Sequence, residues 1–237
     1  MSAGQHAPVS DAAAFFDVDE TLITVKSMFS FLEFYLRRNG EPDSTYQRLS
    51  GELHAAAAGG LDRTQVNRRY YRLYAGESAK RLSAVGEEWF ADRLTRGLFV
   101  TETVNELLLR RQAGDFIALV SGSFFACLDP ISSALQVDWV LSTRPVVKNG
   151  LLTGRVVTPM IGAAKGRAAQ VTASVLGLDL ASSSAYGDHI SDLDLLRSVG
   201  RPVVVGASPE LVEYAELAGW QRLATDLGSR QTLKAGA

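Results

Sequence analysis

Residues 12–21 read AAAFFDVDET, an apolar run that ends at two aspartates, Asp17 and Asp19, one residue apart. A short continuous apolar run is typical of a buried strand in a parallel sheet, so we expect a strand over residues 12–16. The aspartates then lie at its carboxyl end, where open α/β sheets bind ligands. Because residues i and i+2 point the same way, both carboxylates can face one site. There they can hold a hard cation such as Mg²⁺, or one of them can attack phosphorus. The alternative interpretation is an Asp-rich turn that caps the next helix.

The composition is that of an ordinary globular protein. The chain has 237 residues, of which 46% are hydrophobic and 21% charged, which argues against extensive disorder. A net charge of -2 gives no basic footprint for nucleic acid or an acidic membrane, and we expect neither as a partner. No apolar stretch approaches membrane-spanning length. The single cysteine, Cys127, excludes an internal disulfide and fits a reducing, cytoplasmic location.

The pattern of the chain changes twice. Residues 1–11 lack the charged-then-apolar order of a signal peptide, and we expect a loose N-terminal tail there. From about residue 27 to 94 the periodicity is helical, with an apolar helix around 29–36 and further helices expected over 43–57, 64–74 and 79–94. We interpret residues 25–95 as a helical cap inserted after the first strand, above the two aspartates.

Strands and helices alternate after the cap. Strands are expected over 115–120, 137–141, 181–186 and 202–205, and Asn149-Gly150 predicts a hairpin over 145–154. Helices are expected over 103–112, 124–135, 164–176, 191–198 and 209–218, the first with Thr103 and Glu106 spaced as a capping box. This alternation predicts an α/β fold, a doubly wound, mainly parallel sheet with helices on both faces, formed by residues 12–24 and 96–237.

Three further polar motifs follow predicted strands or open predicted helices. Ser121-Gly122 offers a hydroxyl and backbone amides suited to a phosphate, or is a plain turn and helix cap. Lys165, near a helix N-terminus, opposes the helix dipole, which indicates a bound anion unless the lysine is simply solvated. Asp188 and Asp192 can serve a cation and its surroundings, or residues 191–192 cap a helix.

Together and in this order, these motifs resemble the four motifs of the haloacid dehalogenase-like superfamily. Within it the chain is most similar to the phosphoserine-phosphatase-like subfamily IB, which has a helical cap after the first strand, and the resemblance covers residues 12–205. It implies a Mg²⁺-dependent phosphatase that hydrolyses a small phosphorylated metabolite. Asp17 would be the nucleophile that becomes an aspartyl-phosphate, and Asp19 the general acid and base.

The same resemblance assigns the other site residues. Ser121 and the Gly122 amide would bind phosphate oxygens, and Lys165 would neutralise the phosphate and the nucleophile. Mg²⁺ would be held by the carboxylates of Asp17 and Asp188 and by the backbone carbonyl of Asp19. Asp192 would orient water or the lysine, and Thr21 would help to position the loop that carries the nucleophile.

The sequence departs from the phosphoserine phosphatase pattern at Lys26. Those enzymes carry an acidic residue nine positions after the nucleophile, where it pairs with the substrate ammonium. A cation at this position would repel an ammonium, so we hypothesise an anionic or hydroxyl-rich substrate and not phosphoserine, unless Lys26 is merely solvated. His189, beside Asp188, could touch substrate or be a solvated loop residue. Arg68 is a possible substrate-binding residue of the cap, although a solvated basic helix face is the simpler reading.

Two alternatives stay open on the sequence alone. The protein could transfer phosphate to an alcohol instead of water, or it could be a non-catalytic phosphate- or metal-binding regulator. Asp19 argues against a regulator, which has no need for an acid two residues after a phosphorylated aspartate. The sequence does not predict the oligomeric state.

Overall fold

The computed structural model describes residues 10–226, so most of the expected N-terminal tail, residues 1–9, lies outside the described part of the chain. The strands are β1 (Ala13–Phe16), β2 (Phe116–Ser121), β3 (Trp139–Ser142), β4 (Pro145–Lys148), β5 (Leu151–Val156), β6 (Ser184–Gly187), β7 (Arg201–Val205) and β8 (Gln221–Leu223). The helices are α1 (Ser27–Arg38), α2 (Asp43–Ala58), α3 (Arg63–Arg72), α4 (Ala79–Leu94), α5 (Thr101–Gln112), α6 (Phe125–Leu135), α7 (Ala163–Leu176), α8 (Leu193–Leu196) and α9 (Pro209–Ala218), with a 3-10 turn at Ile190–Asp192.

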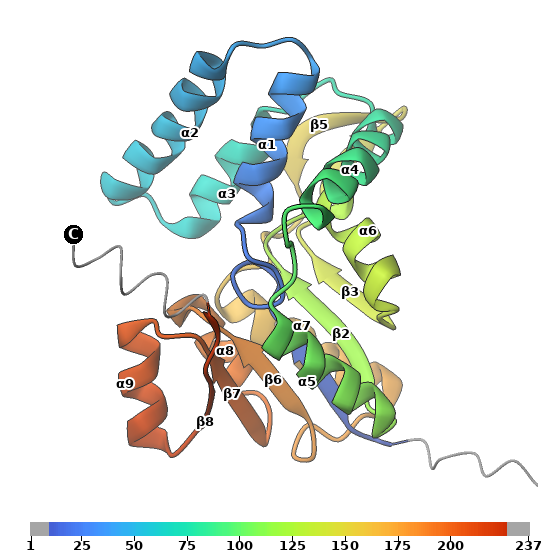
Figure 1. The fold of residues 1–237 in the computed structure, drawn as a ribbon, viewed down its shortest axis with the longest axis vertical. Helices are drawn as coiled ribbons and strands as arrows, with labels where there is room; N and C mark the ends of the chain where they lie inside the picture. The colour runs from blue at the N-terminus through green and yellow to red at the C-terminus, as the bar shows by residue number, and fades with distance from the viewer. Residues whose placement is uncertain (1–9, 227–237) are drawn as a thin grey trace, which may run out of the picture.

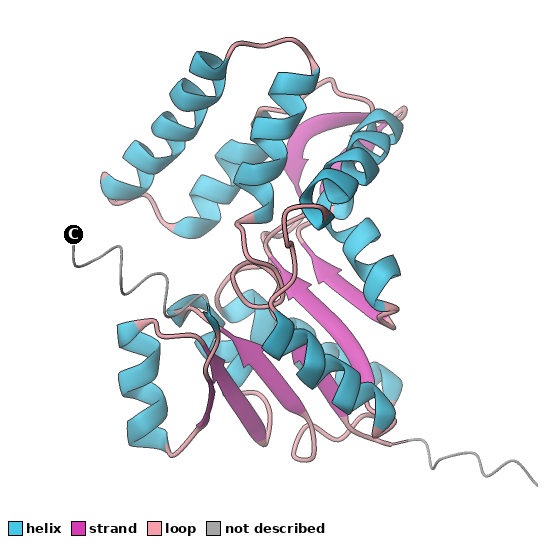
Figure 2. Cartoon of the chain, viewed as in Figure 1, coloured by secondary structure: helices cyan, strands magenta, loops and turns pink. Residues whose placement is uncertain are grey.

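The core is a six-stranded sheet in the order β3-β2-β1-β6-β7-β8, in which all neighbouring strands are parallel. This arrangement confirms the predicted doubly wound α/β fold. The first strand of the chain is central: Ala14 pairs with Ile117 of β2 on one side and with Ser184 of β6 on the other. The carboxyl ends of β1, β2 and β6 therefore meet at the middle of one edge (Figure 2).

Alternate residues of β1 enter two different apolar clusters. Ala14 and Phe16 pack in a cluster with residues of α5 and α6, whereas Ala13 and Phe15 pack in a cluster with residues of α7, α8 and α9. All four β1 residues are fully buried. Helices thus cover both faces of the sheet, which is why this strand reads as a continuous apolar run and not as an alternating one.

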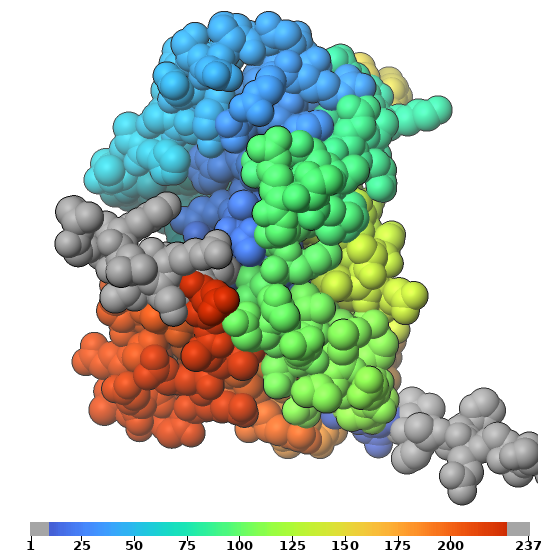
Figure 3. Space-filling model, in the orientation of Figure 1, coloured from blue at the N-terminus to red at the C-terminus, as the bar shows by residue number. Residues whose placement is uncertain are grey.

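Helices α1 to α3 stand above the carboxyl edge of the sheet (Figure 1), and their blue-to-cyan atoms lie in the upper part of the molecule in Figure 3. Helix α4 packs instead against α6 of the core, at a contact so close that a Cβ on Gly86 would lie 1.9 Å from the Ala126 carbonyl oxygen. The hairpin β4–β5 is joined to the cap by backbone hydrogen bonds from Gly76 to Leu152 and from Leu152 to Glu77, of 2.7 and 2.8 Å. The hairpin therefore forms part of the cap wall although it comes from the later half of the chain.

Most predicted elements are confirmed to within a few residues. The capping box at Thr103 is wrong, since α5 begins at Thr101 after Val100, and no side chain caps it. The backbone N–H of Val100 donates to the Leu22 carbonyl at 2.9 Å, which fixes the start of the helix two residues earlier. Strand β8, of only three residues, carries too little pattern to be predicted. Within the described residues, no helix combines the length and apolar character that crossing a bilayer requires.

Candidate active site

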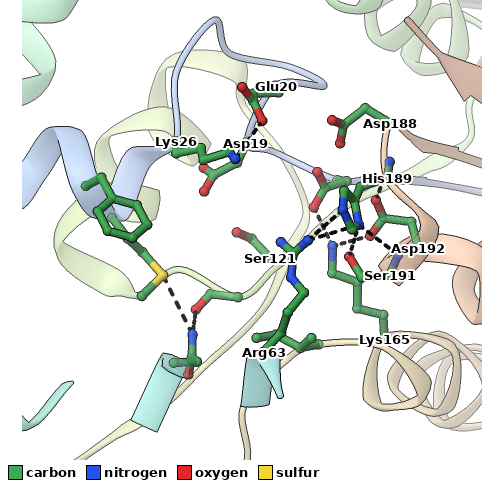
Figure 4. Close-up of a pocket in the computed structure, with 16 residues that line it drawn as sticks. Asp19, Glu20, Lys26, Arg63, Ser121, Lys165, Asp188, His189, Ser191 and Asp192 are labelled. Carbon is green, nitrogen blue, oxygen red and sulfur yellow. Dashed lines mark hydrogen bonds and ion pairs between the residues drawn. The ribbon is translucent and has the colours of Figure 1, made fainter. Parts of the chain in front are cut away.

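The cavity at the carboxyl ends of β1, β2 and β6 has a volume of about 120 Å³. It brings together most of the predicted site residues: the cavity is lined by Asp17, Asp19, Lys26, Ser121, Gly122, Lys165, Asp188 and Asp192 (Figure 4). Its floor is fixed by backbone pairing, because the N–H of Asp17 donates to the Tyr186 carbonyl at 2.9 Å. Residues that are far apart in the sequence reach this cavity because parallel strands end at one edge.

Three carboxylates gather at the centre of the cavity. Asp17, Asp188 and Asp192 each offer an oxygen that lies within 4.8 Å of the others. The Thr21 hydroxyl lies between two of them, 3.2 Å from Asp17 Oδ2 and 3.1 Å from Asp188 Oδ1. Thr21 therefore ties the loop after β1 to the loop after β6.

Lys165 is the positive charge of this cluster. Its Nζ lies 2.5 Å from Asp17 Oδ1 and 2.5 Å from Asp192 Oδ1, and only 4% of the residue is exposed. Burial disfavours the ammonium, but the charges of Asp17 and Asp192 outweigh it and raise the pKa of Lys165. The lysine is therefore a fixed cation and not a proton donor.

Glycines make this approach possible. A Cβ on Gly166, directly after the lysine, would lie 2.6 Å from the Asp194 carbonyl oxygen, so only glycine lets α7 pack this closely on α8. A Cβ on Gly187 would lie 2.7 Å from the Cβ of Asp192. Because neither glycine has a side chain, α7 and the turn after β6 come close enough for Lys165 to bridge two carboxylates.

Asp192 also organises the loop after β6. Its Oδ2 accepts a hydrogen bond of 3.2 Å from the backbone N–H of His189. The cap of the following turn is His189 itself, whose Nδ1 accepts from the N–H of Ser191 at 3.0 Å, and not Ser191 or Asp192 alone. With the lysine on Oδ1 and this amide on Oδ2, both oxygens of Asp192 have partners, which suits a positioning role.

Asp188 and Asp17 lie in surroundings that disfavour a charged carboxylate. Burial and then the neighbouring Asp17 raise the pKa of Asp188 to about 8. Burial also raises the pKa of Asp17, although Lys165 opposes the shift. Crowded buried carboxylates of this kind are relieved by a divalent cation, and carboxylate oxygens are the ligands Mg²⁺ prefers, so the donor set fits such an ion.

Asp19 faces the same cavity from the turn after β1. Its Oδ1 accepts a 3.1 Å hydrogen bond from the N–H of Ser27 at the start of the cap, and burial raises the pKa of its carboxyl. The next residue, Glu20, has a left-handed backbone with φ of 61°, which turns the chain sharply at this point. Glu20 pairs with Lys26 at 3.5 Å, so the cationic side chain is held at the cavity rim.

The Ser121-Gly122 segment is held from both sides. Ser121 Oγ accepts from the N–H of Ser123 at 3.1 Å. The Gly122 carbonyl accepts from Asn67 Nδ2 at 2.9 Å and from the Tyr71 hydroxyl at 3.1 Å, both on α3 of the cap. These two contacts could not be predicted from the sequence, since nothing in the residues of α3 indicates which of them face the core.

The arginine that the cap supplies to the cavity is not the predicted one. The predicted residue, Arg68, lies outside the set of residues that line the cavity, and its Nη1 donates to the Val156 carbonyl at 3.2 Å. Arg63, one and a half turns earlier, lines the cavity instead and its Nη1 lies 2.9 Å from both ring nitrogens of His189. Burial and then Arg63 lower the pKa of His189.

Known proteins resemble the chain in sequence and in fold. A family model described as haloacid dehalogenase-like hydrolase matches residues 14–197. The chain is 29% identical over 222 residues to a probable phosphatase of Mycobacterium tuberculosis, covering 92% of this chain and 76% of that protein. It is also 29% identical over 245 residues to a phosphoserine phosphatase of the same organism, covering 95% and 77%. A solved structure of a protein of unknown function from Bordetella pertussis Tohama I aligns with a TM-score of 0.82 and 29% identity, over 90% of this chain and 98% of that one.

Proposed function

This chain belongs to the haloacid dehalogenase-like hydrolase family, and we propose that it is a Mg²⁺-dependent phosphatase acting through an aspartyl-phosphate. The observation that carries the proposal is the buried contact between Lys165 and Asp17, 2.5 Å apart, with Asp19 facing the same cavity. A carboxylate held beside a fixed cation is suited to approach a negatively charged phosphate that it would otherwise repel. The phosphatase name of a relative that is 29% identical supports the same reading.

In the first step, an Asp17 oxygen attacks phosphorus and the bond from phosphorus to the ester oxygen breaks. Asp19 gives its proton to the departing alkoxide, so the alcohol leaves neutral. Burial raises the pKa of Asp19, which keeps a proton available on this carboxyl. The hydrogen bond from Ser27 to its Oδ1 holds the group in one orientation.

In the second step, Asp19, now ionised, takes a proton from water as the water oxygen attacks the phosphorylated Asp17. Inorganic phosphate leaves, the Asp17 carboxylate is restored, and Asp19 is protonated again. Throughout, Lys165 and the Ser121-Gly122 turn neutralise and orient the phosphoryl oxygens. Phosphoryl transfer needs positioning and charge neutralisation more than covalent chemistry from the protein, which this set of groups can supply.

Mg²⁺ would be held by the carboxylates of Asp17 and Asp188 and the backbone carbonyl of Asp19, with Asp192 orienting the lysine from behind. When bound, the ion supplies positive charge that screens the carboxylates and the phosphate from one another. The protein residues keep the roles given above, and Thr21 holds the two carboxylate loops together.

We propose that the substrate is a small metabolite other than phosphoserine. Lys26 lines the cavity and pairs with Glu20 at the rim, where a cation would repel an ammonium group. The Lys26→Glu variant tests this assignment: we expect it to raise activity on phosphoserine relative to anionic esters. An unchanged substrate ranking would remove Lys26 from substrate recognition.

We also propose a cytoplasmic location for the protein, as expected from its single cysteine.

The proposal is tested by phosphate release from a panel of phosphoserine, sugar phosphates, polyol phosphates and phosphorylated hydroxy acids, with Mg²⁺ and with chelator. Turnover that needs Mg²⁺ and disappears in Asp17→Asn is the expected result. The Asp19→Asn variant should still accept phosphate onto Asp17 slowly, so trapped phosphoprotein separates the two aspartates. Phosphate appearing on an added alcohol would indicate a transferase, and no turnover of any ester by folded, Mg²⁺-binding protein would favour a regulator.

A further inference from the structure

A second cavity adjoins the candidate active site within the cap. Its volume is about 250 Å³, twice that of the cavity over the aspartates. The two share a set of lining residues: Lys26, Met28, Phe29, Arg63, Asn67 and Ile161. Because six residues line both, the second cavity lies directly beside the first, and we call it the cap chamber.

The cap chamber is apolar where the first cavity is charged. The residues that line only the chamber are Leu53, His54, Ala57, Val66 and Tyr70, contributed by α2 and α3. Among the described residues that line it, none is acidic, and its two charged residues, Lys26 and Arg63, also line the first cavity. A molecule that spans both cavities would therefore need a charged end, a polar middle and an apolar end.

The chamber wall is held in place before any ligand binds. The ring of Phe29 stacks on His54 with centroids 4.8 Å apart and contacts the edge of Tyr70 at 6.4 Å. The Tyr70 hydroxyl donates to the Met28 carbonyl at 2.7 Å, which ties α3 to α1. The neighbouring interior of the cap, around Phe31, Tyr74 and Trp89, is fully buried in one apolar cluster. The chamber is therefore a local cavity and does not reflect loose packing throughout the cap. Pockets lined by apolar side chains with a few polar groups at one end are typical of ligand sites.

We propose that the cap chamber binds the apolar part of the substrate, which is then a phosphomonoester of an amphipathic alcohol bearing an alkyl chain. The inference rests on the proposed phosphatase function. With the phosphate beside Lys165, the ester oxygen faces Asp19 and the alcohol continues past Lys26 and Arg63 into the chamber. The length of chain that the chamber accepts sets the substrate range.

The test is phosphate release from a series of monoalkyl phosphates, from methyl to octyl, with kcat/KM measured for each. Each methylene that enters an apolar site is worth up to about fourfold in kcat/KM, so we expect a steep rise with chain length that levels off when the chamber is full. A flat or falling series, with methyl phosphate turned over, would overturn the chamber while leaving the phosphatase intact. No release from any ester, here and in the metabolite panel, would overturn both.

A matched pair of variants locates the effect. Ala57 lines the chamber on α2 and is exposed, so Ala57→Phe should fill the space and abolish the rise from methyl to octyl. Ala55, two residues earlier on the same helix, is exposed and does not line the chamber, so Ala55→Phe should keep the wild-type rise. An unaltered chain-length dependence in Ala57→Phe would show that the alkyl chain binds elsewhere. A loss in both variants would show that the effect comes from the helix and not from the chamber.

Discussion

The Nζ atom of Lys165 lies 2.5 Å from Oδ1 of Asp17, although the two residues are 148 positions apart in the chain. The contact joins the first helix turn of α7 to the residue that follows β1, and both partners are buried. A buried ion pair is strongly coupled, because removing one partner leaves the other charge without compensation.

Replacing the lysine should cost both activity and stability. In Lys165→Met the carboxylates of Asp17 and Asp192 lose their shared cation, and we expect phosphate release to fall by about 10²- to 10³-fold. Metal-free protein should lose about 3–5 kcal/mol of unfolding free energy, measured in denaturant. Lys80→Met, on an exposed position of α4, is the control and should change neither quantity. Activity within a few fold of wild type in Lys165→Met would contradict the role of the lysine.

Stabilisation by Mg²⁺ should grow with pH. In the metal-free fold the pKa of Asp188 is raised from 3.8 to about 8, so the folded protein holds this proton more tightly than the unfolded chain does. The resulting stability is present at low pH and is lost as the pH rises through this window. Because Mg²⁺ binds the ionised carboxylate, protons compete with the ion for Asp188, and this competition weakens as the pH rises through the same range.

We therefore expect the rise in Tm on adding Mg²⁺ to be larger at about pH 8 than at about pH 6. Thermal unfolding with and without the ion measures it. Asp188→Asn removes the titrating group and should flatten the dependence. A larger shift at the lower pH in the wild type would disprove the linkage.

Gly166 should tolerate no side chain. In Gly166→Ala the added Cβ would lie 2.6 Å from the Asp194 carbonyl oxygen, so α7 must move away from α8 and take the lysine with it. We expect a loss of about 1–3 kcal/mol in unfolding free energy, together with reduced activity. Gly51→Ala is the matched control, since its Cβ meets open space on α2. That substitution should stabilise the protein by about 0.5–1 kcal/mol, and equal effects of the two would refute the packing argument.

The pKa of His189 should show whether Arg63 of the cap contacts the His189 ring in solution. Burial and then Arg63 lower it from 6.5, because a nearby guanidinium disfavours the imidazolium. Arg63→Gln should raise this pKa towards its ordinary value, as followed by NMR titration of the ring. Arg69→Gln, exposed on the same helix, should leave the His189 titration in place. If Arg63→Gln leaves the curve unmoved, the contact between cap and loop does not persist in solution.

Much of the core was predictable because each motif is local. The apolar run before Asp17 marks a buried strand whatever its neighbours are. The close approaches at Gly166 and Gly187, by contrast, were not predicted and are seen only in the structure. The family and the fold class, predicted from these motifs, are confirmed. The roles of the individual site residues stay predictions.

The cap residues that line the cavity could not be predicted from the sequence, because their position depends on tertiary contacts. Arg63, Asn67 and Arg68 occupy one helix with similar polar neighbours, and only the packing of α3 against α2 and β5 decides that the first two line the cavity. The attachment of hairpin β4–β5 to the cap is equally hard to predict, since part of it consists of backbone hydrogen bonds. Backbone pairing between distant segments leaves no residue signature.

The central position of β1 also sets the order in which the protein can assemble during synthesis. Asp17 is synthesised well before Tyr186, yet its backbone N–H pairs with the Tyr186 carbonyl, and Ala14 pairs with Ser184. The strand Ala13–Phe16 must remain unpaired on that side until β6 has been made. Contacts so distant in sequence slow folding and leave apolar surface open to aggregation. Slower translation of the segment between β2 and β6 would lengthen that exposure.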